Sequence, residues 1–337
     1  MIWSLKFGVW SLSFSLLSHL WLHEPDSDTI SRASIELGLP VADPSTLALA
    51  YADLFLLNVY PYGTAFSDPS GELNGPAAQR LAALYEAHGY QPPELNLVGA
   101  PDHLGLCLGF LAHLAERDVD ADLADTKVRS SFCADLLVWA PVCCLAAERN
   151  PSTHPFYRTL AACTREHLLA ETSKSQTPRG RFAVSNLRSQ VPTPELQNQQ
   201  STIHIQQSED EVRLRDIVRF FLAPARCGVF LSRSRLGQLA KALGVRLPFG
   251  SRFEVAEMLF ESAGESGQVA ELLRALGAEV EQWAAAYRAW VAEYPAWQLI
   301  AVDWLERIDS ARQTLTGMRE ILESPPELEY EEAQVND

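Results

Sequence analysis

The sequence has none of the short motifs that carry most nucleotide, metal and hydrolase chemistry. It contains no G-x-x-x-x-G-K-[ST] loop, no G-x-G-x-x-G after a strand, no H-E-x-x-H and no G-x-S-x-G. Cys163 and His167 are four residues apart, but that spacing on an amphipathic helix is weak evidence for a nucleophile and its base. We therefore predict a protein that binds rather than catalyses, with no cofactor.

The cysteines also lack the spacing of a redox or metal site. None of the six is part of a C-x-x-C pair, and most fall on apolar helical faces. Such cysteines are typical of buried thiols in a reducing compartment. His19 and His23 have the spacing of a metal-binding pair on a helix, but no second ligand pair accompanies them. The sequence therefore predicts no metal site.

Long apolar runs are missing as well. Residues 1–22 are apolar enough to suggest a signal peptide or anchor, but polar residues interrupt them: Ser11, Ser13, Ser15, Ser18 and His19. The run falls short of the roughly 20 strongly apolar residues that a membrane span needs, and no small-x-small cleavage site follows. The large side chains instead have helical spacing, namely Trp10, Phe14, Leu17 and Trp21. We expect a first core helix, no membrane insertion and a cytoplasmic protein.

Basic side chains are scarce in the first half of the chain. The formal net charge is −16, and residues 1–171 carry 9 basic and 20 acidic side chains. An acidic surface attracts cationic partners and makes binding to nucleic acid unlikely. Solubility alone is an alternative explanation for this charge.

Helical periodicity without strand alternation predicts an all-α protein with two helical domains, 1–171 and 212–324. Residues 172–211 lack periodicity and are expected to form a disordered polar and basic linker, and 325–337 an acidic disordered tail. Helices are expected at 8–22, 28–38, 45–57, 75–88, 101–117, 126–148 and 152–171, then at 212–223, 232–243, 251–263, 266–293 and 296–323. One face of the second domain collects large rings, a pattern typical of packing: Trp283, Tyr287, Trp290, Tyr294 and Trp297.

The most informative motif is Pro101-Asp102-His103-Leu104, which places polar groups at the start of an otherwise apolar helix. Other segments accompany it: Tyr51-Ala-Asp-Leu-Phe55, Pro61-Tyr62-Gly63-Thr64, Trp139 in a long helix, and Pro155-Phe156-Tyr157-Arg158. In order and spacing this set resembles the TorD-like redox-enzyme maturation chaperones over about residues 8–171. The resemblance implies a helical chaperone that binds the twin-arginine signal peptide of a molybdopterin oxidoreductase precursor and delays its export until the cofactor is inserted. It also allows a homodimer.

The resemblance further implies that the matching residues border a peptide groove. Asp102 would pair with a peptide arginine, and His103 would act as a neutral acceptor or sense protonation. The remaining predicted peptide-binding residues are Pro101, Leu104, Tyr60, Tyr62 and Trp139. The alternative is that Asp102 only stabilises a helix start. The family commonly has a glutamate three to five residues before Pro-Asp-His, whereas here six residues separate Glu94 from Pro101.

Part of the linker loosely imitates such a peptide. The segment Thr177-Pro178-Arg179-Gly180-Arg181-Phe182 has two arginines followed by an aromatic ring. One hypothesis is that it visits the peptide groove and competes with the client. The plainer interpretation is a solvated basic tether.

A second constellation is basic. Between Asp216 and Glu254 there is no acid, and the candidate contacts for an anionic partner are Arg226, Arg233, Arg235, Lys241, Arg246 and Arg252. Residues 232–263 resemble a helix-turn-helix, so a DNA-binding regulator is the first alternative function. The other interpretations are binding of an anionic partner and docking against the acidic first domain. A structural assembly subunit of an oxidoreductase complex is the remaining alternative function.

Overall fold

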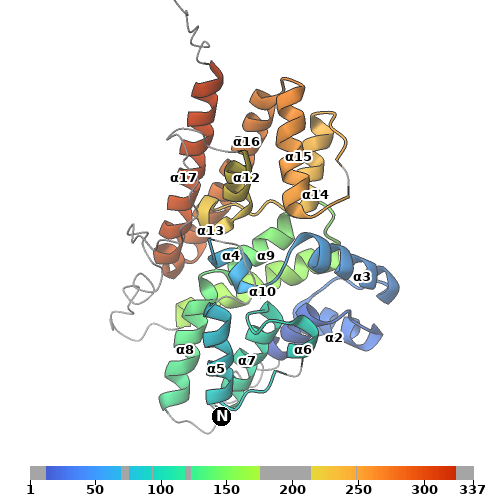
Figure 1. Cartoon of the computed structure of the whole chain (residues 1–337). Coiled ribbons are helices and arrows are strands. Elements are labelled where there is room, and N and C mark those ends of the chain that lie inside the picture. Colours follow the sequence, from blue (N-terminus) through green and yellow to red (C-terminus); the bar gives the residue numbers. More distant parts are fainter. Residues whose placement is uncertain are drawn as a thin grey trace, which may run out of the picture.

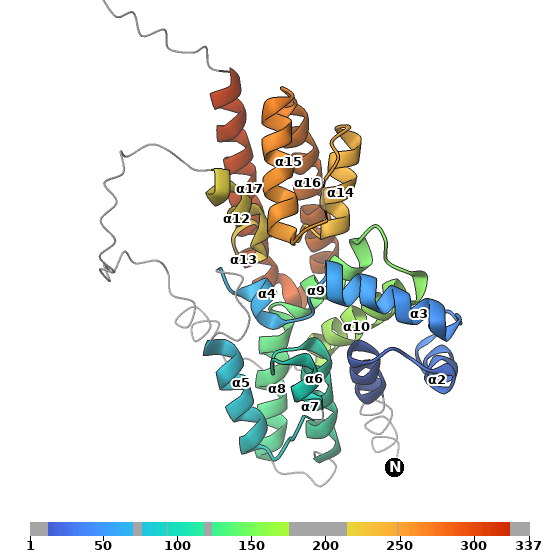
Figure 2. The same ribbon diagram turned by 45° about the vertical axis from the view of Figure 1, so that its right-hand side comes forward.

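The computed structural model describes residues 13–69, 76–92, 94–117, 123–174, 214–247 and 249–323. Within these ranges the chain is helical, and the one pairing of β type is an isolated bridge between Tyr62 and His103. The predicted all-α class is therefore confirmed. The helices form two groups: residues up to 174 make the lower group in Figures 1 and 2, and residues from 214 onward make the upper group.

The first helix group opens with a helix at residues 13–22. It continues with α2 (Ser27–Leu37), α3 (Pro44–Tyr51), the π-helix η1 (Ala52–Asn58), α4 (Gly63–Ser67), α5 (Pro76–Ala87), α6 (Leu95–Val98), α7 (Leu104–Arg117), α8 (Leu123–Leu137), α9 (Ala140–Arg149) and α10 (Pro155–Lys174). The second helix group contains α12 (Leu214–Leu222), α13 (Pro224–Cys227), α14 (Arg233–Ala242), α15 (Arg252–Glu265), α16 (Val269–Glu293), the 3-10 helix η3 (Pro295–Trp297) and α17 (Gln298–Glu323). The expected disordered linker and tail lie outside the described residues, except that residues 172–174 continue α10 and the linker prediction is wrong for them.

Local sequence fixes several of the helix starts. The side chains of Asp26 and Asp43 cap α2 and α3 by accepting from backbone N–H groups three residues further on. Ser251 and Glu254 form a reciprocal capping box at the start of α15. Gly38 ends α2 in the left-handed conformation, which glycine adopts without a steric penalty. These signals explain why most predicted helices begin and end within a few residues of the observed ones.

The expected single helix at 126–148 is wrong. α8 ends at Leu137 and α9 begins at Ala140, with Pro141 in its first turn. Proline has no N–H and its ring clashes with the preceding turn, so the chain bends here by 41° and Trp139 lies at a break between helices. No single described helix is long and apolar enough to cross a membrane, although the bent pair Lys127–Leu137 and Ala140–Arg149 together meets that test of length and composition.

One hydrophobic core runs through both helix groups. The predicted aromatic stripe of α16 is buried, with Trp283 at 1%, Tyr287 at 0% and Trp290 at 5% exposure, so its packing role is confirmed. Two arginines of the first group lie over its rings: Arg149 is 5.5 Å from the centre of Trp283 and Arg165 is 5.0 Å from that of Trp290. The stripe therefore packs the second helix group onto the first.

A buried carboxylate adds a polar link between the two groups. Glu279 of α16 is 3% exposed and accepts hydrogen bonds from Arg149 of α9 at 3.0 Å and from Arg235 of α14 at 2.8 Å. The indole of Trp283 donates a third hydrogen bond to it at 3.0 Å. Two guanidinium groups and an indole N–H thus compensate the cost of burying this charge.

Candidate functional site

Two loop segments cross at the start of α7, and backbone hydrogen bonds join them. The N–H of Leu104 donates to the carbonyl of Pro61 at 2.7 Å, and the N–H of Gly63 donates to the carbonyl of Asp102 at 3.0 Å. The bridge between Tyr62 and His103 lies between these two bonds. We call residues 61–64 and 101–104 the motif crossing, because both segments come from the motifs that the sequence singles out.

The carboxylate of Asp102 is enclosed within the motif crossing. Its residue is 5% exposed, and its Oδ2 accepts from both the backbone N–H and the hydroxyl of Thr64 at 2.8 Å. Thr64 lies in the first turn of α4, where N–H groups have no partner within the helix. The Oδ1 atom is buried without a hydrogen-bond partner. The expectation of a carboxylate open to a peptide arginine is therefore wrong for this structure. Asp102 stabilises a helix start, but that helix is α4.

His103 is equally enclosed, at 3% exposure. Its Nδ1 accepts from the N–H of Gly105 at 3.1 Å, and its ring meets the Tyr62 ring edge-on with 5.0 Å between centroids. Burial lowers the pKa of His103 to about 3. His103 is therefore neutral above acidic pH, and the expectation that it senses protonation near neutrality is wrong.

Two more predicted contacts belong to the packed interior. Leu104 is fully buried, and Trp139 is 8% exposed and stacks on Phe66 with ring centroids 6.5 Å apart. A Cβ added to Gly63 would come within 3.0 Å of the Trp139 ring, so glycine permits this approach. Both residues act as packing residues, and the expectation that they line an open groove is wrong. Pro101 is partly exposed, and its carbonyl accepts from the Tyr85 hydroxyl at 2.9 Å.

The second helix group covers one side of the motif crossing. Phe230 stacks on Phe66 of α4 with centroids 5.0 Å apart, and the guanidinium of Arg252 lies 4.6 Å from the Phe230 ring centre. Arg252 donates to the carbonyl of Leu222 at 2.6 Å, and burial lowers its pKa to about 10, an effect that the nearby Tyr60 opposes. Tyr60 therefore lies toward the second helix group.

Tyr62 has an open side at the motif crossing. Its ring is half-buried, and its hydroxyl donates to the carbonyl of Val98 at 2.7 Å, which ties the crossing to α6. Burial and the negative charge of Asp102 raise the pKa of Tyr62, so the phenol stays neutral at physiological pH. Leu97, the residue before Val98, is 68% exposed. An aromatic and an aliphatic side chain therefore meet solvent here.

Two carboxylates border this open side. The Oε1 atom of Glu94 is 3.5 Å from Nε2 of His23, and the Glu94 side chain is 30% exposed. Glu24 follows His23 and is exposed. Burial raises the pKa of Tyr51, and Tyr62 and Glu24 raise it further, so both lie within electrostatic range of this phenol. We name this set of residues the Tyr62 surface: Tyr62, Leu97, Glu24 and Glu94.

The sequence pointed to only part of this surface. Tyr62 belongs to a recognised motif, and Glu94 was noted for its distance from Pro101. Glu24 and Leu97 were missed because they join the surface through long-range packing, which has no local sequence signal. Exposure of the large apolar Leu97 on a four-residue helix could not be inferred from periodicity.

The basic residues of the second helix group do not form one surface. Arg252 is enclosed, Arg235 pairs with Glu279, and Arg233 lies 4.0 Å from the ring centre of Phe249. The remaining three are exposed: Arg226, Lys241 and Arg246. Docking of Arg235 against the acidic first domain is wrong, because its carboxylate partner lies on α16 of the same helix group.

The helix-turn-helix interpretation is also wrong. α14 ends at Ala242 and α15 begins at Arg252, so residues 243–251 connect them. A helix-turn-helix motif has a turn of three or four residues between its helices. Burial of Arg252 at the start of α15 further removes a side chain that would have to reach DNA.

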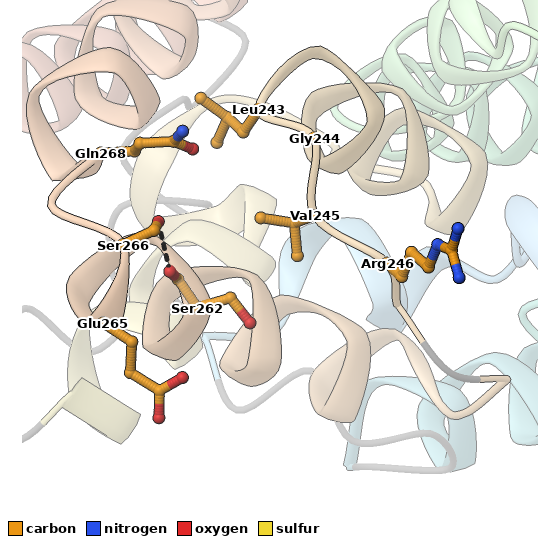
Figure 3. Close-up of a pocket in the computed structure, with 8 residues that line it drawn as sticks. All are labelled: Leu243, Gly244, Val245, Arg246, Ser262, Glu265, Ser266 and Gln268. Atoms are coloured by element: carbon orange, nitrogen blue, oxygen red, sulfur yellow. Dashed lines mark hydrogen bonds between the residues drawn. The ribbon is translucent and has the colours of Figure 1, made fainter.

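A shallow hollow of about 440 Å³ lies in the second helix group, away from the motif crossing. Figure 3 shows that the chain after α14 and the turn between α15 and α16 line it, with Val245 near its centre. The side chains of Arg246 and Glu265 point to opposite sides, and Ser266 donates to the carbonyl of Ser262 at 2.6 Å. No polar groups converge in it, so it has no features of a catalytic site.

The nucleophile candidate is equally inert. Burial raises the pKa of the Cys163 thiol to about 11, and Nδ1 of His167 lies 2.8 Å from the Cys163 carbonyl oxygen. A protonated thiol is a poor nucleophile. No group of three His, Cys, Asp or Glu residues in the described ranges could hold a metal ion.

Part of the chain, including both segments of the motif crossing, is similar to known proteins. Residues 27–145 match the family described as "Nitrate reductase delta subunit". This match, with the relatives that follow, confirms the resemblance to TorD-like redox-enzyme maturation chaperones in that part of the chain.

Particular relatives are named "Chaperone protein TorD". The protein of Vibrio cholerae serotype O1 strain O395 is 39% identical over 106 residues, which cover 28% of this chain and 47% of the relative. The protein of strain M66-2 matches with the same values, and that of strain N16961 is 38% identical over 105 residues. The chain thus spans about half the length of the curated relatives it matches.

Proposed function

We propose that this protein is a cytoplasmic chaperone that binds the twin-arginine leader of a molybdopterin oxidoreductase precursor at the Tyr62 surface. The observation that carries the proposal is the joining of two TorD-like motifs in the motif crossing, with a partly exposed Tyr62 hydrogen-bonded to the short helix that Glu94 precedes. Planar guanidinium groups pair well with carboxylates. Tyr62 and Leu97 offer apolar area to the residues that follow the arginines.

In this proposal Tyr62 is the residue of the motif crossing that touches the leader, and Asp102, His103 and Leu104 only position it. Asp102 fixes α4 through Thr64, and His103 supports the Tyr62 ring from the side. Leu104 and Trp139 fill the core beneath. Loss of any of these residues would weaken the packing beneath Tyr62 and would not delete a contact with the leader.

The proposed action has three steps. The chaperone captures the leader, withholds the unfinished enzyme from export while cofactor is inserted, and releases it by dissociation. Release requires moderate affinity. Partly exposed ion pairs contribute only about 0.2–1 kcal/mol each, so two of them leave the complex readily reversible, and we expect a Kd of roughly micromolar order.

A titration tests this proposal. A labelled synthetic peptide with two adjacent arginines and an apolar stretch is titrated with the full chain, followed by fluorescence anisotropy. The double variant Glu24→Gln/Glu94→Gln should weaken binding about twofold to thirtyfold at low salt, because two rim pairs are worth about 0.4–2 kcal/mol together. Glu261→Gln/Glu265→Gln, which removes two exposed carboxylates of α15, is the matched control. Equal losses in both variants, or none, would reject the Tyr62 surface as the binding site.

A further inference from the structure

The chain contains a segment with the same chemistry as the proposed ligand. Residues 174–188 carry four basic residues and no acid: Lys174, Arg179, Arg181 and Arg188. Phe182 directly follows the two central arginines, and Val184 and Leu187 add apolar side chains further along. The segment therefore combines closely spaced guanidinium groups with a following apolar stretch.

We propose that residues 179–182 of this segment dock on the Tyr62 surface of their own chain when no client leader is bound. Arg179 and Arg181 pair with the carboxylates at its border, and Phe182 packs on the exposed side of Tyr62. The inference rests on the proposed function because it concerns regulation of the same surface. In this arrangement residues 179–182 compete with the client leader, which must displace them in order to bind.

Charge complementarity favours this occupant. The described stretch from Glu24 to Asp53 begins at the Tyr62 surface with Glu24 and is strongly acidic, with Arg32 as its single basic residue. Its acids are Glu24, Asp26, Asp28, Glu36, Asp43 and Asp53. The nearby Glu94 adds a further carboxylate. Such a field raises the local concentration of a tethered cationic segment.

The length of chain also permits the contact. α10 runs beside the helix at residues 13–22, since the Trp21 indole donates to Thr164 at 2.9 Å. Near the other end of α10, Glu24 helps to raise the pKa of Tyr157. Helical rise puts Lys174, where α10 ends, about 26 Å from Tyr157, and Arg181 is seven residues further along the chain. Extended chain covers up to about 25 Å over seven residues, so Arg181 and its long side chain reach Glu24.

The consequence is measurable competition. A tethered ligand competes at an effective concentration on the order of 1 mM when its tether spans the two sites. If the free segment binds with a Kd of roughly 100 μM, the tethered copy weakens any second peptide at the same surface about tenfold.

The test uses the full chain and a labelled synthetic peptide of residues 174–188. Its anisotropy is followed with the wild type, with Arg179→Ala/Arg181→Ala/Phe182→Ala, and with the matched control Ser185→Ala/Asn186→Ala/Ser189→Ala. The arginine variant should bind the peptide about tenfold more tightly than the wild type and the control. Adding Glu24→Gln/Glu94→Gln to the arginine variant should reverse that gain.

The outcomes separate this inference from the proposed function. Equal affinity of the peptide for the wild type and the arginine variant would overturn the inference, even if the twin-arginine leader still binds in a Glu24- and Glu94-dependent way. A second measurement applies if the labelled peptide of residues 174–188 binds too weakly for anisotropy. A photoreactive residue at Leu97 should cross-link to residues 179–182 of the same chain, whereas one at Leu299, which is 65% exposed on α17, should not. Absence of the Leu97 cross-link would also overturn it.

Discussion

Replacement of Asp102 by alanine should destabilise the protein and hardly affect its affinity for a leader. The carboxylate accepts two hydrogen bonds from Thr64 at 2.8 Å, and both donors are buried. Hydrogen bonds to a charged group contribute about 1.5–3 kcal/mol each. The partnerless Oδ1 is itself costly to bury, and its removal recovers part of the loss. The net expectation is a decrease of about 2–4 kcal/mol in the free energy of unfolding.

Urea unfolding followed by circular dichroism measures this change. Thr64→Val keeps the backbone donor and removes the hydroxyl, so it should cost less than Asp102→Ala. The double variant should cost less than the sum of the two single variants, because they share one interaction. Glu86→Ala, which removes an exposed side chain of α5, is the surface control, and its free energy of unfolding should stay within about 0.5 kcal/mol of that of the wild type.

The affinity for the leader decides between a positioning role and a contact role. The positioning role would be refuted if Asp102→Ala changed the free energy of unfolding as little as Glu86→Ala does and also bound the leader tenfold more weakly. That pair of results would mean that the carboxylate of Asp102 leaves Thr64 to meet the leader arginine directly.

Two further predictions concern titration and the link between the helix groups. Because the folded pKa of His103 is about 3 and its unfolded value about 6.5, the unfolded chain takes up this proton first. The contribution of His103 to stability is therefore constant above pH 6.5 and falls as the pH drops toward 3. Its NMR ring signals should stay fixed from pH 8 to 5, and a midpoint near 6.5 would contradict its burial. Glu279→Ala should lower the free energy of unfolding by about 3–5 kcal/mol, because it leaves Arg149 and Arg235 without their shared carboxylate. Glu281→Ala on the same helix, whose partner Arg312 is at the surface, should cost under about 1 kcal/mol in the same urea titration, and equal losses would contradict the buried link.

The helical class and most helices followed from the sequence because caps and apolar periodicity are local signals. The exceptions have physical causes. Pro141 breaks a stretch whose apolar pattern continues unchanged, and four- and five-residue helices such as α6 and α4 are too short to show periodicity. The aromatic stripe of α16 was recognisable as a packing surface, but only the structure shows that it receives Arg149 and Arg165 of the first helix group.

The site was only partly predictable for a related reason. Pro-Asp-His is a visible motif, yet sequence alone does not reveal whether a carboxylate faces solvent or a buried backbone N–H. The partner of Asp102 is Thr64, which belongs to another motif, and the two segments meet only after folding. Likewise, the basic run after Asp216 looked unpaired because its acid, Glu279, lies far along the chain.

A cross-linking map of the bound leader is the sharpest test of whether the Tyr62 surface binds it. A twin-arginine peptide with a photoreactive residue directly after the arginines is bound to the full chain, irradiated and digested, and the linked residues are identified by mass spectrometry. We expect links to residues 23–24, 62 and 94–101. Links confined to the second helix group, or to residues on the far side of the first, would contradict it.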